Sequence, residues 1–171
     1  MTQTVHGVLI NVDGTGVLLF GEASVGKSEC ALELLSRGHR LVADDVVEIE
    51  RRDNSVFGHS PFRFVGLLEI RDLGVFDVRQ VYDRSAYAAE TKVDLCIELR
   101  KSPANEERDR IGADTESIDL LGVLLPKLYL RVERGRNVAV LVETAVKLFN
   151  CGDNNAESAL IRDHDNLISA S

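Results

Sequence analysis

Residues 21–28 form the part of the sequence whose spacing is most specific for a chemical task. They read Gly-Glu-Ala-Ser-Val-Gly-Lys-Ser, which is the pattern G-x-x-x-x-G-K-S. In such a loop the glycines let backbone N–H groups point at a polyphosphate, the lysine reaches the β- and γ-phosphates, and the final hydroxyl helps to hold Mg²⁺. An ordinary glycine-rich turn is the weaker interpretation, because a strand-like run precedes the loop and a helix-like run follows it. The pattern predicts a nucleotide-binding loop made of Gly21, Glu22, Ala23, Ser24, Val25, Gly26, Lys27 and Ser28.

Two adjacent carboxylates, Asp44 and Asp45, follow the short strand expected over 39–43. In a nucleotide enzyme, one such carboxylate can hold a metal through its coordination shell while the other accepts the proton of an attacking hydroxyl. A solvated acidic turn is the alternative, and the dipeptide alone favours neither. The nearby phosphate loop favours the functional interpretation.

Three further positions carry weaker signals. Glu69 lies within the apolar run 66–78, where an unpaired charge needs water, a partner or a metal; paired charges on an amphipathic edge explain the same pattern. Arg110 ends a charged loop and could clamp a phosphoryl group, although such loops are usually only solvated. His6 begins the first strand, where a lone histidine is more often structural than catalytic.

The hydrophobic pattern supplies the elements that must position these residues. Strands are expected over 5–12 and 17–20, joined by an Asp-Gly hairpin turn, and a helix over 29–37 ends at Gly38. A polar segment, flexible or partner-facing, follows over 79–92. The remaining expectations are extended runs over 46–49, 56–58, 93–99 and 118–130, the last broken at Gly122 and Pro126, a basic turn over 131–136, and helices over 137–150 and 156–168.

Composition bounds the class of protein. The 171 residues are 44% hydrophobic and 28% charged, which suits one globular domain, and the net charge is −8. Acidity, scarce aromatics and the absence of Trp argue against a general nucleic-acid binder, although a small basic patch stays open. Three widely spaced cysteines indicate free thiols in a reducing compartment. Without an apolar run of about 20 residues or a signal-peptide pattern, we expect a cytoplasmic protein with no membrane partner.

Together, these motifs resemble the catalytic domain of bacterial HPr kinase/phosphorylase, which modifies a serine of HPr, the phosphocarrier of the sugar phosphotransferase system. The resemblance extends from His6 to about Phe149. Order and spacing agree across all of its parts, which is far more specific than a phosphate loop alone. The segments that carry it are His6–Leu9, the loop running into Glu29, Arg37–Asp45, Leu68–Gly74, Arg110–Gly112 and Gly135–Val140.

The resemblance implies an α/β fold, a P-loop kinase-like domain with a central mixed sheet flanked by helices, with residues 1–171 forming one catalytic domain of a homohexamer. It also implies ATP-dependent phosphorylation of HPr with Mg²⁺, and a reverse activity in which inorganic phosphate attacks phospho-HPr and releases pyrophosphate. A P-loop kinase of a small metabolite is the alternative enzyme, and a nucleotide-binding regulatory module without transfer activity is the alternative of another class.

Residue roles follow from the same resemblance. Asp45 would accept the proton of the target serine and return it in the reverse direction, while Asp44 would orient metal or substrate. Lys27 would neutralise charge on the transferring phosphoryl group. The remaining carried-over roles are Mg²⁺ binding by Ser28 and Glu69 and membership of the catalytic group by His6 and Arg110.

Three departures from the family pattern stand out. Asp72 replaces a usual glycine, which adds bulk and charge near the expected site. In the turn over 131–136, which the family uses mainly for dephosphorylation, Arg131, Glu133 and Arg134 replace Pro, Arg and Pro. Losing two rigid prolines and reversing one charge disfavours phosphorolysis relative to kinase activity. The family's common N-terminal domain is absent, as in a natural short form or a truncated piece.

Overall fold

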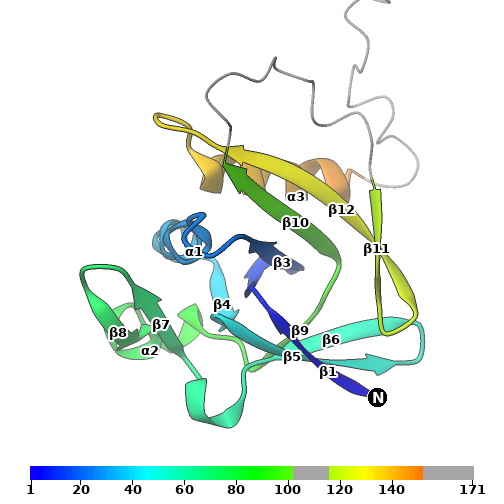
Figure 1. The fold of residues 1–171 in the computed structure, drawn as a ribbon. Coiled ribbons are helices and arrows are strands. Elements are labelled where there is room, and N and C mark those ends of the chain that lie inside the picture. Colours follow the sequence, from blue (N-terminus) through cyan, green and yellow to red (C-terminus); the bar gives the residue numbers. More distant parts are fainter. Residues whose placement is uncertain (102–115, 152–171) are drawn as a thin grey trace, which may run out of the picture.

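The computed structural model describes residues 1–101 and 116–151 (Figure 1). Arg110, the charged loop before it and the helix expected over 156–168 lie outside the described residues. The elements, in chain order, are β1 (Thr2–His6), β2 (Val8–Val12), β3 (Thr15–Gly21), α1 (Lys27–Ser36), β4 (Arg40–Ala43), β5 (Val46–Arg52), β6 (Ser55–His59), η1 (Phe62–Phe64), β7 (Leu67–Ile70), β8 (Gly74–Asp77), α2 (Val78–Val81), η2 (Arg84–Ala86), β9 (Glu90–Lys92), β10 (Leu95–Lys101), β11 (Glu116–Leu120), β12 (Val123–Val132) and α3 (Val138–Asn150).

A six-stranded sheet with the order β11-β12-β10-β3-β2-β4 lies at the centre. Strands β3, β10 and β12 run parallel to one another, whereas β2 and β11 run antiparallel to their neighbours. Strand β4 is antiparallel to β2 and therefore runs in the same direction as β3. The predicted fold class, α/β with a central mixed sheet, is confirmed.

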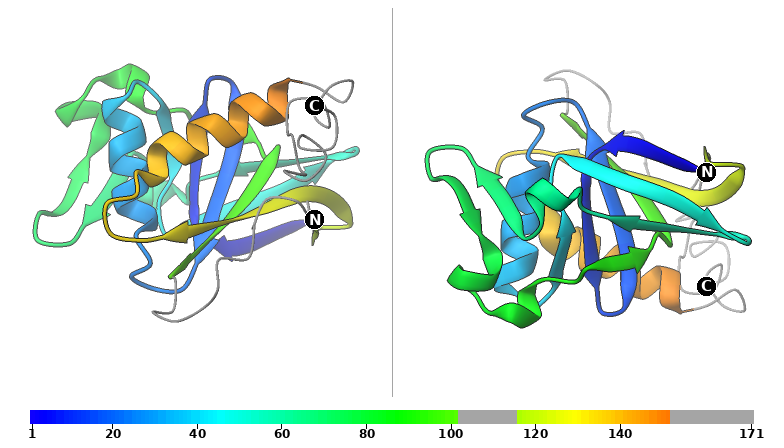
Figure 2. Two further views of the ribbon diagram at one scale, coloured as in Figure 1. Left: turned by 90° about the horizontal axis from the view of Figure 1, so that it is seen from above. Right: turned by 90° about the horizontal axis from the view of Figure 1, so that it is seen from below.

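Alternating side chains divide the core between the two faces of this sheet. Val17 and Leu19 of β3 belong to the cluster that packs under α1 and α3, whereas Leu18 belongs to a second cluster on the opposite face. The sheet β1-β5-β6-β9 covers that opposite face. Both long helices therefore cover one face, and Figure 2 shows α3 lying across α1. None of the helices among the described residues has the length and apolarity needed to cross a membrane.

Gly7 divides what the alternation predicts as one strand over 5–12. The two halves, β1 and β2, pair in different sheets. A Cβ at Gly7 would lie 2.5 Å from the carbonyl oxygen of Leu19, and the Gly7 N–H donates to the Asp45 carbonyl at 3.0 Å. Only glycine fits this approach, and the chain passes here from one sheet to the other.

One expected break in the extended run over 118–130 also needs correction. Gly122 lies in a turn as predicted, but Pro126 lies inside β12, because the β10 ladder begins only at Lys127 and Pro126 faces Ser117 of β11. The segment 79–92, expected to be flexible or partner-facing, contains most of α2, η2 and β9.

Candidate active site

The direction of the strands brings the two predicted chemical motifs to one edge of the sheet. Because β4 runs in the same direction as β3, the carboxyl ends of both strands lie at that edge. The phosphate loop leaves β3 at Gly21, and the pair Asp44–Asp45 directly follows β4. Open α/β sheets usually bind ligands at the carboxyl ends of their strands.

The phosphate loop depends on backbone conformations that favour glycine. Gly21 has φ +143° and Gly26 has φ +108°, and Ser24 is also left-handed with φ +64°. A Cβ at Gly21 would lie 2.4 Å from the carbonyl oxygen of Leu99, so a side chain there would clash with β10. The chain then enters α1 directly at Lys27, two residues earlier than predicted, with the positive end of the helix at the loop.

Lys27 is folded back over this loop. Its ammonium donates to the carbonyl oxygens of Gly21 at 2.9 Å and Glu22 at 3.0 Å. An ammonium has three donors, and these contacts use two of them. These bonds hold the positive charge against the first two carbonyl groups of the loop.

Asp44 connects the phosphate loop to strand β7. One carboxylate oxygen accepts from the Ser28 hydroxyl at 3.0 Å, and the other accepts from the backbone N–H of Glu69 at 2.9 Å. The side chain is buried, being only 8% exposed. Burial raises the pKa of Asp44 above its ordinary value, the two hydrogen bonds oppose this rise, and the charges of Asp45 and Glu69 add to it.

Asp45 is exposed and has φ +66°, a left-handed conformation that an aspartate adopts at a cost of about 1 kcal/mol. Its carbonyl accepts from Gly7, and the N–H of Val46 donates to the Asp44 carbonyl at 2.8 Å. Backbone contacts on both sides thus hold this residue in place. Strained residues of this kind concentrate at functional sites.

A pocket of about 160 Å³ lies beside the acidic pair. Its lining includes three acidic residues, Asp44, Asp45 and Glu69, and the other lining residues are apolar. The apolar lining consists of Val46, Phe64, Leu67 and Val75. Sequence reasoning missed these apolar residues, although one signal was present: Leu68 and Ile70 alternate with Glu69, so Leu67 had to share the face of Glu69.

Of the other predicted residues that the structure describes, none is part of the pocket lining. His6 is exposed at the end of β1 and pairs with Val46 of β5, one residue from the acidic pair. Lys27 precedes Ser28, whose hydroxyl bonds to Asp44 of the lining. Asp72 lies in the turn between β7 and β8 with φ +74°, a left-handed conformation that favours the glycine usual in the family.

The oxygen donors suit Mg²⁺ as a shared rather than an all-protein site. Among residues 1–101 and 116–151 there is no group of three or more His, Cys, Asp or Glu side chains placed to hold a metal alone. Mg²⁺ commonly uses one or two carboxylates together with substrate phosphates and water. The oxygen atoms of Ser28, Asp44 and Glu69 fit such a partial set, because Ser28 and the Glu69 backbone both bond to Asp44 and both carboxylate residues line the pocket.

A phosphate loop after the central strand and an acidic pair after a second strand of the same direction define a P-loop protein of the mixed α/β type. Residues 1–162 match the family described as the HPr Serine kinase C-terminal domain. The chain belongs to this family.

Similar proteins agree with that assignment. The chain is 44% identical over 140 residues to an HPr kinase/phosphorylase of Clostridium beijerinckii, covering 82% of this chain and 46% of that protein. It is 44% identical over 147 residues to one of Bordetella avium, covering 85% and 48%. The chain thus spans about half the length of these relatives. The structure of the Hpr(Ser) kinase/phosphatase from Coxiella burnetii matches with a TM-score of 0.81 and 32% identity, covering 92% of this chain and 96% of that one.

Proposed function

We propose that this chain transfers the γ-phosphoryl group of ATP to a serine hydroxyl of HPr in the cytoplasm. One observation carries the proposal: Asp44 joins the phosphate loop, through Ser28, to the pocket that contains Asp45. The names of the similar proteins, HPr kinase/phosphorylase and Hpr(Ser) kinase/phosphatase, support this choice of reaction and acceptor.

Each residue has a task in this reaction. The loop N–H groups and Lys27 hold the nucleotide phosphates, and Asp45 accepts the proton of the serine hydroxyl as its oxygen bonds to phosphorus. The bond from the γ-phosphorus to the bridging oxygen breaks, and ADP leaves. Ser28, Glu69 and the nucleotide phosphates would hold Mg²⁺, and Asp44 would orient Ser28. The bound ion would supply positive charge against the oxygens of the transferring phosphoryl group. His6 and Arg110 complete the proposed catalytic group.

The reverse reaction uses the same residues. Inorganic phosphate would attack phosphoserine, Asp45 would return its proton to the serine oxygen, and pyrophosphate would leave. The turn over 131–136 follows β12, whose carboxyl end lies at the same sheet edge as the phosphate loop. Because this turn lacks two rigid prolines of the family pattern, we propose that phosphorolysis is slower than phosphorylation.

The direct test incubates the chain with labelled ATP, Mg²⁺ and HPr. We expect label on HPr, none on HPr whose target serine is alanine, and none with the Lys27→Ala enzyme at unchanged circular dichroism. Label only in small molecules would support a metabolite kinase instead, and ATP binding without turnover would support a regulatory module. Sedimentation equilibrium tests the proposed homohexamer, in which residues 1–171 act as one catalytic domain.

A further inference from the structure

Exposed apolar side chains gather on one segment of the described residues. Ten large apolar side chains are exposed among all the described residues, and six of these ten fall within the segment 62–82. Monomeric proteins scatter such residues, whereas contiguous patches usually mark contact sites. The six are Phe62, Phe64, Leu73, Val75, Val81 and Tyr82.

The β7–β8 hairpin does not need all of these side chains for its own packing. Leu68 and Ile70 are buried in the helix-side cluster and anchor the hairpin to the core. Glu69 pairs directly with Val75 across the two strands, so both side chains lie on the opposite face, toward the pocket. Val75 is 59% exposed, which shows that this face is not covered by the described chain.

Phe64 and Val75 complete the apolar half of the pocket that contains Asp45. A volume of about 160 Å³ is smaller than the roughly 300–1,000 Å³ of sites that enclose a whole small ligand. A polar metabolite would also need hydrogen-bonding groups around its hydroxyls, and here the only ionic or polar side chains of the lining are the three carboxylates. An apolar wall beside these carboxylates fits an alkyl or aromatic side chain next to the reacting hydroxyl.

We propose that Phe64 and Val75 are specificity-determining residues that receive an apolar side chain flanking the acceptor serine of a protein substrate. The inference rests on the proposed phosphoryl transfer to HPr at Asp45 and assigns the residues that contact the acceptor beside its serine. Phe64 lies 46% exposed at the end of η1 and is available for such a contact.

The test compares Phe64→Ser and Val75→Ser with the matched control Leu124→Ser, which changes a side chain 70% exposed on β12 and outside the pocket. With HPr as acceptor, we expect each pocket variant to lower kcat/KM about tenfold through KM for HPr, the size expected for a lost apolar contact. The kcat and the KM for ATP should stay within about twofold of wild type. The control should match wild type.

A second arm changes the acceptor. Replacing the residues next to the HPr serine one at a time by serine should find a position that lowers kcat/KM of the wild-type enzyme by a similar factor and has little further effect on Phe64→Ser, because the two changes remove one contact. Pocket variants that behave like the control, on an HPr that the wild type labels, would overturn this inference and leave the proposed function standing. Variants that instead dissociate a homo-oligomer, with unchanged KM for HPr, would also overturn it. Absence of any label on HPr with wild type would overturn the proposed function and this inference together.

Discussion

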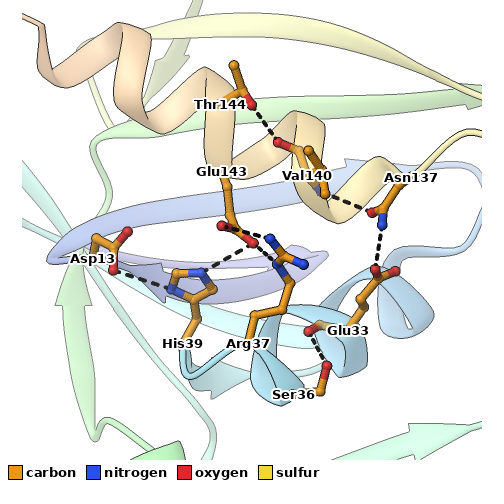
Figure 3. A network of polar contacts seen from close by, with 9 residues as sticks. All are labelled: Asp13, Glu33, Ser36, Arg37, His39, Asn137, Val140, Glu143 and Thr144. Atoms are coloured by element: carbon orange, nitrogen blue, oxygen red, sulfur yellow. Dashed lines mark hydrogen bonds and ion pairs between the residues drawn. The ribbon is translucent and has the colours of Figure 1, made fainter.

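The two ends of helix α1 arrange their polar groups in opposite ways. At the N-terminal end no side chain caps the helix, the preceding Gly26 is left-handed, and Ser28 bonds to the buried Asp44. At the C-terminal end the side chains of Glu33, Arg37 and the following His39 meet residues of α3 (Figure 3). One end leaves backbone donors for a ligand, and the other uses its polar groups within the protein.

The C-terminal end forms a polar clasp between α1 and α3. Arg37 donates to Glu143 through two nitrogens, and Asn137 donates to Glu33 at 2.8 Å. The Asn137 oxygen also caps α3 by accepting from the N–H of Val140 at 3.0 Å. Buried His39 lies 3.7 Å from Glu143, and its Nε2 is the one buried side-chain polar atom of the described ranges without a hydrogen-bond partner.

We expect this difference to separate groups that stabilise the fold from groups that serve the proposed reaction. Changes at the N-terminal end should reduce catalysis with little effect on the free energy of unfolding. Changes in the clasp should do the reverse. The predictions below test that separation, beginning with the largest effect.

Asp45→Asn should lower kcat for HPr phosphorylation by about 10³-fold, within the range expected for loss of a general base. Asparagine tolerates the left-handed backbone of this residue, φ +66°, so the melting temperature should stay unchanged. Asp53→Asn is the matched control, since Asp53 is also exposed and left-handed, with φ +54°, in the β5–β6 turn. Equal turnover in the two variants would remove Asp45 from the proton-acceptor role.

The same substitution at both ends of α1 tests the comparison directly. Ser28→Ala removes the hydrogen bond to Asp44 and a proposed Mg²⁺ ligand, and should lower kcat/KM about 10- to 100-fold. Ser36→Ala removes only a local bond to the Glu33 carbonyl, 2.6 Å long, and should leave kcat/KM unchanged. Steady-state assays at several Mg²⁺ concentrations measure both. A comparable loss in both variants would mean that the ends of the helix are not functionally distinct.

Asn137→Ala removes the N-cap bond to Val140 and the contact with Glu33. It should lower the free energy of unfolding by about 1 kcal/mol, the usual value for loss of an N-cap. Urea unfolding measures the change, and Thr144→Ala, farther along α3, serves as a control that removes only a bond to the Val140 carbonyl. Turnover of the folded Asn137→Ala enzyme should match wild type. A large loss of kcat without loss of stability would place this end of the molecule in the catalytic machinery.

The parts of the site that could be predicted from sequence are those whose chemistry is local. The loop 21–28 and the pair Asp44–Asp45 are short motifs, and the direction of β4 follows from a hairpin and a helix of ordinary length. The predicted roles of these residues stay predictions that the assays above test.

The parts that could not be predicted depend on contacts between distant residues. Arg37 and Glu143 lie 106 positions apart, and no periodicity in either helix indicates their pairing. The break at Gly7 depends on a carbonyl of another strand, at Leu19. The apolar lining of the pocket likewise depends on where the hairpin β7–β8 packs, which the pattern of 66–78 leaves open.

The smallest predicted effect is on the pH dependence of the free energy of unfolding. Its sign should differ between groups at the two ends of α1. Hydrogen bonding from Arg37, with added charge from Arg37 and His39, holds the pKa of Glu143 below its ordinary 4.5. The unfolded chain therefore takes up this proton first, so the stabilisation is complete above pH 4.5 and is lost as pH falls through the lower folded pKa. Glu143→Gln should lower the free energy of unfolding at pH 7 by about 0.5 kcal/mol and weaken its decline below pH 4.5.

Asp44 should show the opposite dependence in buffers free of divalent cations. Burial raises its folded pKa above the ordinary 3.8, so the folded state keeps this proton longer than the unfolded state. Ionised Asp44 then opposes folding, and its cost develops as pH rises from 3.8 through the raised pKa. In urea titrations between pH 3 and 7, Asp44→Asn should therefore gain stability relative to wild type as pH rises, whereas Glu143→Gln should lose it. Difference curves with the same sign would show that the two ends of the helix do not differ in the way their contacts indicate.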